Sequence, residues 1–288
     1  MTRVAVTGTT GRVGAALGRY FSRDHEVIEL PRARFDLADP TGMARVLENL
    51  DCDIFLNPAG VTDLEACLDD PALAQRVNAD APGEIAAWAA RRGVRLIHFS
   101  TDYVLGGRES GLHDETATPE PLSDYARSKR AGEVAVLAQP GTCVMRVSWV
   151  FGPEKAALVD TVRAKAMAGE PLAAVADKFS LPTFTADLAA WVLAVATSDL
   201  TGIVHACNSG APVSWHDLAE EVVRGLYDSD QLRVRPEITR QALAETASFR
   251  AIRPRHTAMA TPRLTALLGT APRPWQAALV EYFNFPGR

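Results

Sequence analysis

The sequence predicts an α/β protein: a doubly wound parallel sheet of the Rossmann type, followed by a smaller mixed α/β lobe at the C-terminal side. Short, wholly apolar runs alternate with amphipathic helical stretches through the first half of the 288-residue chain. Such runs are typical of parallel strands buried on both faces, and right-handed crossovers then give a doubly wound sheet. After Gly152 the alternation stops and prolines become frequent. We therefore expect a first domain over 1–151 and a smaller lobe over 152–288, with short returns of the lobe to the main sheet left open.

The expected elements follow in a regular order along the chain. Apolar runs predict five strands, and the helical patterns between them supply the crossovers. The strands are expected at 3–7, 26–30, 53–57, 95–100 and 143–151, and the helices at 12–23, at 41–50, in a proline-broken region that ends near Arg92, and from about Tyr125. In the second part, helical patterns cover 156–168, 187–197 and 214–227, a short apolar segment covers 203–207, and 233–238 is a candidate edge strand.

Composition excludes several classes of partner. Hydrophobic residues make up 47% of the chain and the net charge is -5, so a sizeable core is available and no basic surface for nucleic acid or an anionic membrane stands out. No apolar run approaches the roughly 20 residues that span a bilayer, and no signal-peptide pattern opens the chain. We expect a cytoplasmic protein whose four cysteines, Cys52, Cys67, Cys143 and Cys207, are reduced core thiols.

A glycine loop follows the first expected strand. "TGTTGRVG" places Gly8, Gly11 and Gly14 between a strand and a helix. Gly8 allows the tight turn, Gly11 lets a pyrophosphate approach the backbone, and Gly14 lets the helix pack closely on the strand. The unpaired N–H groups and positive dipole end of the helix then favour an anion. The pattern predicts a dinucleotide site, in which we also place the loop residues Thr10, Arg12 and Val13.

The end of the second strand bears on which dinucleotide is bound. An NAD site usually carries an acidic residue there for the ribose 2′-hydroxyl, whereas this strand runs into Pro31 and then Arg32 and Arg34. Either arginine is suited to a 2′-phosphate, although both are equally compatible with a solvated surface. We favour NADPH, keep NADH as an alternative, and expect Asp36 and Leu37 to border the adenine.

A cluster of hydroxyl groups follows the fourth strand. "HFSTDYVLGG" ends a buried run with Ser100 and Thr101, and "SDYARSK" downstream carries Tyr125 and Lys129 at i, i+4 on a helix. A neighbouring ammonium lowers the pKa of a phenol toward the working range of an acid–base group. Strand C-terminal ends are where ligands bind in open α/β sheets, so we expect these groups to face a carbonyl.

Taken together, these motifs resemble the extended short-chain dehydrogenase/reductases, and most specifically the dTDP-4-dehydrorhamnose reductase family, over nearly the whole chain. The resemblance rests on "TGTTGRVG", "NPAGVTDLEAC", "VNADAP", "FSTDYVLGG", "YARSK", "RVSWVFG", "DKFSLPTFTADLA" and "RPRHTAMATPRL". It implies a dinucleotide-binding domain over 1–151 and a substrate-binding lobe over 152–288. It also implies that Thr101, Tyr125 and Lys129 are catalytic, that Ala59, Gly60 and Ser100, with the same Tyr125 and Lys129, line the cofactor, and that Thr62, Tyr103 and Trp149 contact the sugar.

The residue after Asp102 separates activities within such relatives. Dehydratases of nucleotide sugars carry a glutamate there as a base, and this sequence has the neutral Tyr103. The resemblance therefore implies reduction of a C4 ketone by NADPH, with Tyr125 giving the proton, Thr101 polarising the carbonyl and Lys129 lowering the pKa of Tyr125.

Several positions depart from the family pattern, mostly around the substrate. Pro58 replaces a common alanine, and Ala157 and Leu158 replace an Asn-Phe pair. Lys178 and Ser180 replace a glutamine and a glycine; Lys178 is placed either to reach a substrate diphosphate or to be a solvated charge. Where some members bind magnesium between subunits through glutamates, this sequence has Ala16 and Ala186, so we expect no metal. The scattered histidines make no ligand spacing, and we expect His98, Trp88 and Trp191 to be core residues.

Three functions remain open from the sequence. The leading one is reduction of dTDP-4-dehydro-L-rhamnose to dTDP-L-rhamnose, by a monomer or homodimer that binds a nucleotide sugar. The second is 4-ketoreduction of a different nucleotide deoxysugar. The third is a non-catalytic NADP-binding regulatory subunit resembling the methionine adenosyltransferase beta branch, which the intact set of Thr101, Tyr125 and Lys129 disfavours.

Overall fold

The computed structural model describes residues 1–284, so the last four residues of the expected lobe 152–288 lie outside it. Its main sheet has six strands in the order β10-β5-β4-β3-β1-β2, and every pairing within it is parallel. This order confirms the predicted doubly wound sheet. The strands are β1 (Arg3–Thr7), β2 (Glu26–Leu30), β3 (Ile54–Asn57), β4 (Arg95–Thr101), β5 (Cys143–Val147) and β10 (Gly202–Ala206).

Alternate residues of the strands contribute to two cores, one on each face of the sheet. Val4 and Val6 of β1 face one side and Ala5 faces the other, as the two-residue period of a strand requires. One face is covered by α1 (Arg12–Phe21), α8 (Thr185–Ala196) and α10 (Pro262–Leu268), and the other by α2 (Pro40–Asn49), α5 (Ala81–Arg92) and α6 (Asp124–Leu137). The predicted core positions of Trp88 and Trp191 are confirmed, and all four cysteines are free and buried.

The proline-broken region forms three short helices with a π-helical turn among them. These are α3 (Leu64–Asp69), α4 (Pro71–Gln75) and η1 (Arg76–Asp80), and α5 follows directly. Asn78 of η1 joins this region to α6, because its side-chain amide donates to the Val61 carbonyl (2.9 Å) and to Ser128 (3.1 Å). A Cβ on Gly132 would lie 2.1 Å from the Asn78 carbonyl oxygen. Helix α6 therefore packs so closely on η1 that only glycine fits at position 132. π-helical turns are frequent at functional sites.

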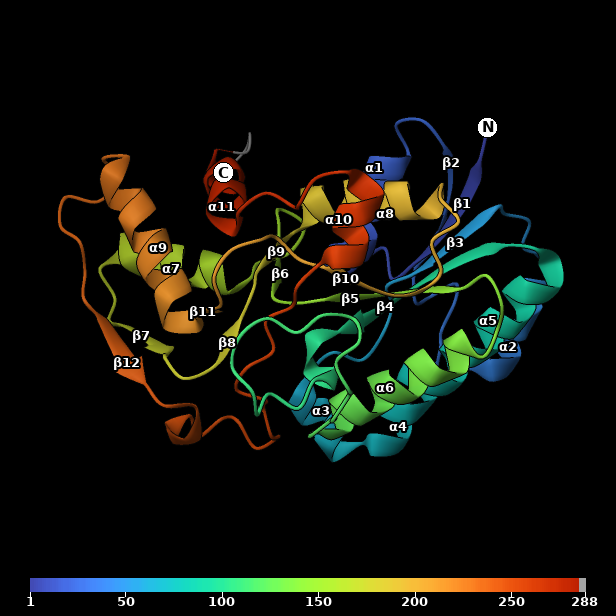
Figure 1. The fold of residues 1–288 in the computed structure, drawn as a ribbon, viewed down its shortest axis with the longest axis horizontal. Coiled ribbons are helices and arrows are strands. Elements are labelled where there is room, and N and C mark those ends of the chain that lie inside the picture. Colours follow the sequence, from blue (N-terminus) through green and yellow to red (C-terminus); the bar gives the residue numbers. More distant parts are fainter. Residues whose placement is uncertain (285–288) are drawn as a thin grey trace.

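A third core holds the smaller lobe, at the left of Figure 1. It is built from α7 (Leu158–Ala168), α9 (Trp215–Asp228) and α11 (Trp275–Phe283) together with three short strand pairs and two 3₁₀ turns. Its remaining elements are β6 (Val150–Phe151), β7 (Leu172–Val175), β8 (Phe179–Ser180), β9 (Thr183–Phe184), β11 (Val213–Ser214), β12 (Ile238–Gln241) and η3 (Leu243–Glu245), while η2 (Asp102–Val104) follows β4. The expected edge strand at 233–238 begins only at Ile238.

Two segments of the second half belong to the main sheet. β10, expected only as a short segment of the lobe, pairs with β5 over five residues, and α8 packs on the same face as α1. Because α8, β10 and α10 return to the first domain, the lobe is discontinuous in sequence, and a boundary at residue 151 stays a prediction.

Candidate active site

A cavity of about 700 Å³ lies at the carboxyl ends of β1, β3, β4 and β5. Its walls include Gly8 after β1, Pro58 after β3, Thr101 at the end of β4 and Ser148 after β5. The chain crosses over in opposite directions from β1 and β3, so the cavity is at the topological switch point where ligands bind in such sheets.

The glycine loop forms one wall of this cavity. Gly8 has φ +59°, in the left-handed region, and a Cβ on Gly14 would lie 2.2 Å from the Gly8 carbonyl oxygen. The N-cap of α1 is Gly11, and no side chain caps its N–H groups. A tight turn, a bare backbone and an uncapped helix end are the features that hold a pyrophosphate, so the residues present fit a dinucleotide.

Most residues predicted from the sequence line the cavity. For the cofactor these are Gly8, Thr10, Gly11, Arg12, Val13, Gly14, Arg32, Asp36, Leu37, Ala59, Gly60, Ser100, Tyr125 and Lys129, and for the substrate Thr62, Tyr103 and Trp149. Two predicted residues, Arg34 and Lys178, are not on its wall. Arg34 donates instead to the Glu29 carbonyl (3.1 Å), so of the two arginines only Arg32 lines the cavity. The role of Arg34 stays a prediction.

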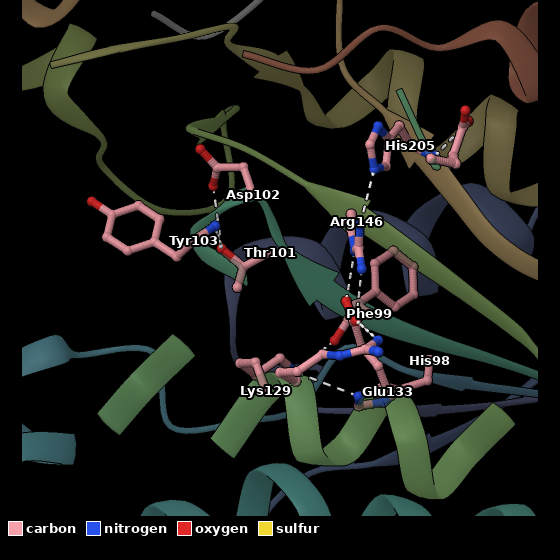
Figure 2. A network of polar contacts seen from close by, with 11 residues as sticks. His98, Phe99, Thr101, Asp102, Tyr103, Lys129, Glu133, Arg146 and His205 are labelled. Atoms are coloured by element: carbon pink, nitrogen blue, oxygen red, sulfur yellow. Dashed lines mark hydrogen bonds and ion pairs between the residues drawn. The ribbon is translucent and has the colours of Figure 1, made fainter. Parts of the chain in front are cut away.

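Two elements bring the three candidate catalytic side chains together. Thr101 ends β4, while Ser123 caps α6 by accepting the Ala126 N–H (3.2 Å), which places Tyr125 and Lys129 in the first turns of that helix. The Thr101 hydroxyl shares a hydrogen bond with the Tyr125 phenol, and Lys129 Nζ donates to the Phe99 carbonyl (2.6 Å). Figure 2 shows Thr101 at the end of the strand and Lys129 beneath it.

Burial is the largest influence on the pKa values of Tyr125 and Lys129. It raises the pKa of the Tyr125 phenol, against the hydrogen bond with Thr101, which acts to lower it. Burial lowers the pKa of Lys129 to about 8, against the charges of Glu133 and Cys67. Lys129 is not among the groups named as acting on Tyr125, and the expected lowering of the phenol's pKa by Lys129 stays a prediction. The phenol is held in the protonated form, which is the form that can donate a proton.

Asp102 supports Thr101 from behind. It is buried, its Oδ1 accepts from the Thr101 hydroxyl (3.2 Å), and its Oδ2 accepts from the hydroxyls of Ser180 (2.9 Å) and Thr257. Burial raises the pKa of Asp102, while the charge of Lys178 and these hydrogen bonds oppose the rise. Asp102 therefore joins the main sheet to the smaller lobe at the point where Thr101 enters the cavity.

Lys178 is part of the same support. Its side chain is fully buried, so the reading as a solvated charge is wrong. Nζ donates to the Pro254 carbonyl (2.8 Å) and lies 4.3 Å from the centre of the Tyr103 ring, a cation–π contact that desolvation strengthens. Lys178 does not line the cavity, and a contact with a substrate diphosphate stays a prediction.

Trp149 interrupts the strand expected over 143–151. It has φ +41°, which is rare for an aromatic residue, and separates β5 from β6. Strained residues of this kind cluster at ligand sites. Its indole Nε1 is buried and has no hydrogen-bond partner among the described residues.

A second cavity of about 480 Å³ shares the side chains of Arg12, Trp149 and Val150 with the first. Its wall includes Trp215, whose ring centre is 5.6 Å from that of Trp149, and Phe249. Neither Trp215 nor Phe249 was predicted to line a cavity, because an aromatic residue has the same local sequence pattern whether it packs in a core or lines a cavity.

Two features are absent from the described residues, 1–284. No group of three or more His, Cys, Asp or Glu side chains is arranged to hold a metal ion. None of the described helices is long and apolar enough to cross a membrane.

Comparison with known proteins decides the family. The model of the RmlD substrate-binding domain matches residues 2–285. The chain belongs to this family. Within the RmlD family, a dTDP-4-dehydrorhamnose reductase of Mycobacterium tuberculosis is 35% identical, over 99% of this chain and 93% of that protein. A probable dTDP-4,6-dihydroxy-2-methyloxan-3-one 4-ketoreductase of Streptomyces antibioticus is also 35% identical, over 98% and 94%.

Solved RmlD-family structures share the fold. The crystal structure of dTDP-4-dehydrorhamnose reductase from Bacillus anthracis, in complex with NADP, superposes with a TM-score of 0.90 at 24% identity, over 98% of this chain and 99% of that one. The resemblance stated from the sequence is thereby confirmed at the level of family and fold.

Proposed function

We propose that this protein reduces the C4 ketone of a dTDP-activated 6-deoxy-4-keto sugar with NADPH, and that dTDP-4-dehydro-L-rhamnose is its substrate. The observation that carries the proposal is the meeting of Thr101, Tyr125 and Lys129 at one cavity with a glycine loop. Its relatives named as dTDP-sugar ketoreductases support the substrate class. A cytoplasmic location and a monomeric or dimeric state stay predictions.

The residues have separate roles in this reaction. When bound, NADPH supplies the hydride. The Tyr125 hydroxyl gives its proton to the carbonyl oxygen as that oxygen becomes an alkoxide, and burial keeps the phenol protonated until then. Thr101 donates to the same oxygen once its hydroxyl turns away from Asp102. Lys129, charged below about pH 8, stabilises the phenolate that remains.

NADPH oxidation with purified dTDP-4-dehydro-L-rhamnose tests the proposal. Removal of a general acid lowers rates by about 10²–10⁴-fold, so Tyr125→Phe should lose kcat by that factor. The matched control is Tyr103→Phe, because the two rings touch edge to face with centres 5.9 Å apart. Loss of the neighbouring hydroxyl should change KM more than kcat. Near-wild-type turnover by Tyr125→Phe would refute the assigned chemistry.

A second substrate is favoured by a specific comparison. The Streptomyces antibioticus relative is as similar as the mycobacterial reductase, so a 4-keto sugar other than the rhamnose precursor is the alternative. A panel of dTDP-4-keto sugars in the same assay separates the two by kcat/KM. Tight NADPH binding with turnover of none of them would favour the regulatory-subunit reading instead.

A further inference from the structure

A line of polar side chains runs behind the cavity from the glycine loop to Lys129. It consists of Thr7 at the end of β1, Asn57 at the end of β3, His98 on β4 and Lys129 on α6. All four are buried, and His98 and Asn57 are fully so. Because buried polar groups must pair donor with acceptor, the protons along this line can be assigned one after another.

The first assignment fixes the amide of Asn57. The backbone N–H of Ala59 donates to the Thr7 hydroxyl oxygen (3.2 Å), and the Thr7 hydroxyl donates to Asn57 Oδ1 (2.8 Å). With its oxygen held by Thr7, the amide turns its Nδ2 toward the next residue. Asn57 Nδ2 lies 3.2 Å from His98 Nδ1.

The second assignment fixes the tautomer of His98. An amide nitrogen is only a donor, so Nδ1 must accept and cannot carry a proton. Burial, and after it the charge of Lys129, hold the pKa of His98 well below its ordinary value. The ring is therefore neutral, and its single proton is on Nε2.

The proton on His98 Nε2 points toward Lys129. His98 Nε2 lies 3.5 Å from Lys129 Nζ, a long contact, while Nζ donates to the Phe99 carbonyl at 2.6 Å. An ammonium group has donors only, so the Nε2–H and the charged amine face each other as two donors. A neutral amine could instead accept the Nε2–H.

From this geometry we propose that His98 is a positioning residue for Lys129, whose Nε2–H opposes the ammonium and makes the amine release its proton more readily. The inference rests on the proposed role of Lys129 in catalysis. The other charged or titratable groups that act on Lys129 are Glu133, on the same helix, and Cys67 of α3, and both favour the ammonium. His98 therefore acts against them, from the strand side.

The pH profile of the reaction tests this role. In His98→Asn the side-chain oxygen can take the place of Nδ1 and accept from Asn57, but nothing replaces the N–H that faces Nζ. The alkaline limb of kcat/KM should move up by about one pH unit, which is a tenfold rise in proton affinity. An unchanged limb would overturn the proposal.

The control for loss of a buried imidazole is His216→Asn. His216 is buried in α9 of the smaller lobe, where its Nε2 contacts the Ile238 carbonyl at 3.1 Å. This substitution should leave the alkaline limb in place, whatever it does to stability. A limb that moved equally in both variants would also count against the proposal.

A second measurement uses the wild-type protein and needs no turnover. In ¹⁵N-histidine-labelled protein, the His98 signals, found by their loss in His98→Asn or His98→Gln, should show a bare Nδ1 and a protonated Nε2 across neutral pH. A proton on Nδ1 would overturn the assignment even if the enzyme is active. A correct tautomer in a protein without reductase activity would instead leave this inference standing and reject the proposed function.

Discussion

Gly14→Ala is the most direct test of how the glycine loop holds α1 against β1. A Cβ at residue 14 would lie 2.2 Å from the Gly8 carbonyl oxygen, whereas ordinary contacts begin at 3.4 Å. The start of α1 must therefore retreat by about 1.2 Å, the difference between these two distances. Overpacking of this kind costs about 1–3 kcal/mol.

Gly18→Ala is the matched control, because it makes the same change one turn later in the same helix. A Cβ at residue 18 meets nothing within 4 Å. Both variants gain the helix propensity of alanine over glycine, about 1 kcal/mol, so the difference between their unfolding free energies isolates the clash at residue 14. We expect Gly14→Ala to be less stable than Gly18→Ala by about 1–3 kcal/mol in urea unfolding.

Cofactor affinity should follow the same order. The retreat moves the uncapped end of α1 away from the pyrophosphate, so NADPH should bind at least about tenfold more weakly to Gly14→Ala, equivalent to about 1.4 kcal/mol. Fluorescence titration of NADPH measures this, and Gly18→Ala should bind as the wild type does. Equal stability and equal affinity of the two variants would refute the reasoning.

Three further outcomes are expected. Because burial lowers the pKa of Lys129 to about 8, its ammonium is present at pH 7 and lost above pH 8, so kcat/KM should fall tenfold per unit well above pH 8; a flat profile to pH 10 contradicts this. Arg32→Ala should raise KM for NADPH by about 10–100-fold, the loss of one or two charge-assisted hydrogen bonds, without changing KM for NADH, whereas Arg34→Ala should change both little. Glu133 makes two 2.8 Å contacts with the fully buried Arg146, and Glu133→Gln removes the carboxylate that pairs with this guanidinium. The substitution should lower the free energy of unfolding by about 3–5 kcal/mol. A loss below about 1 kcal/mol in urea unfolding would contradict this expectation.

Local patterns carried the prediction of the first half of the fold and most of its site. A buried strand, a glycine turn and an amphipathic helix each have a pattern that lies within a short stretch of sequence. The i, i+4 spacing of Tyr125 and Lys129 is likewise a property of one helix. The sites of Gly8, Gly11 and Gly14 were predictable for the same reason, since a glycine is needed where only a hydrogen fits.

What escaped prediction depends on distant contacts. The pairing of β10 with β5 joins residues about sixty positions apart, and nothing within 203–207 specifies that partner. Burial of Lys178 depends on the Pro254 carbonyl and on the Tyr103 ring, which reach it from other segments. The kink at Trp149 is a backbone conformation, and its apolar flanks predict an unbroken strand instead.

The return of β10 to the sheet has a consequence for how this architecture can be recombined. β10 covers the outer edge of β5 along all five of its residues, Cys143–Val147. Cutting the chain once at residue 151 would therefore leave an open strand edge, which invites pairing with other chains. To exchange the smaller lobe between two relatives, it has to be transplanted as several separate segments, with α8, β10 and α10 left in the recipient.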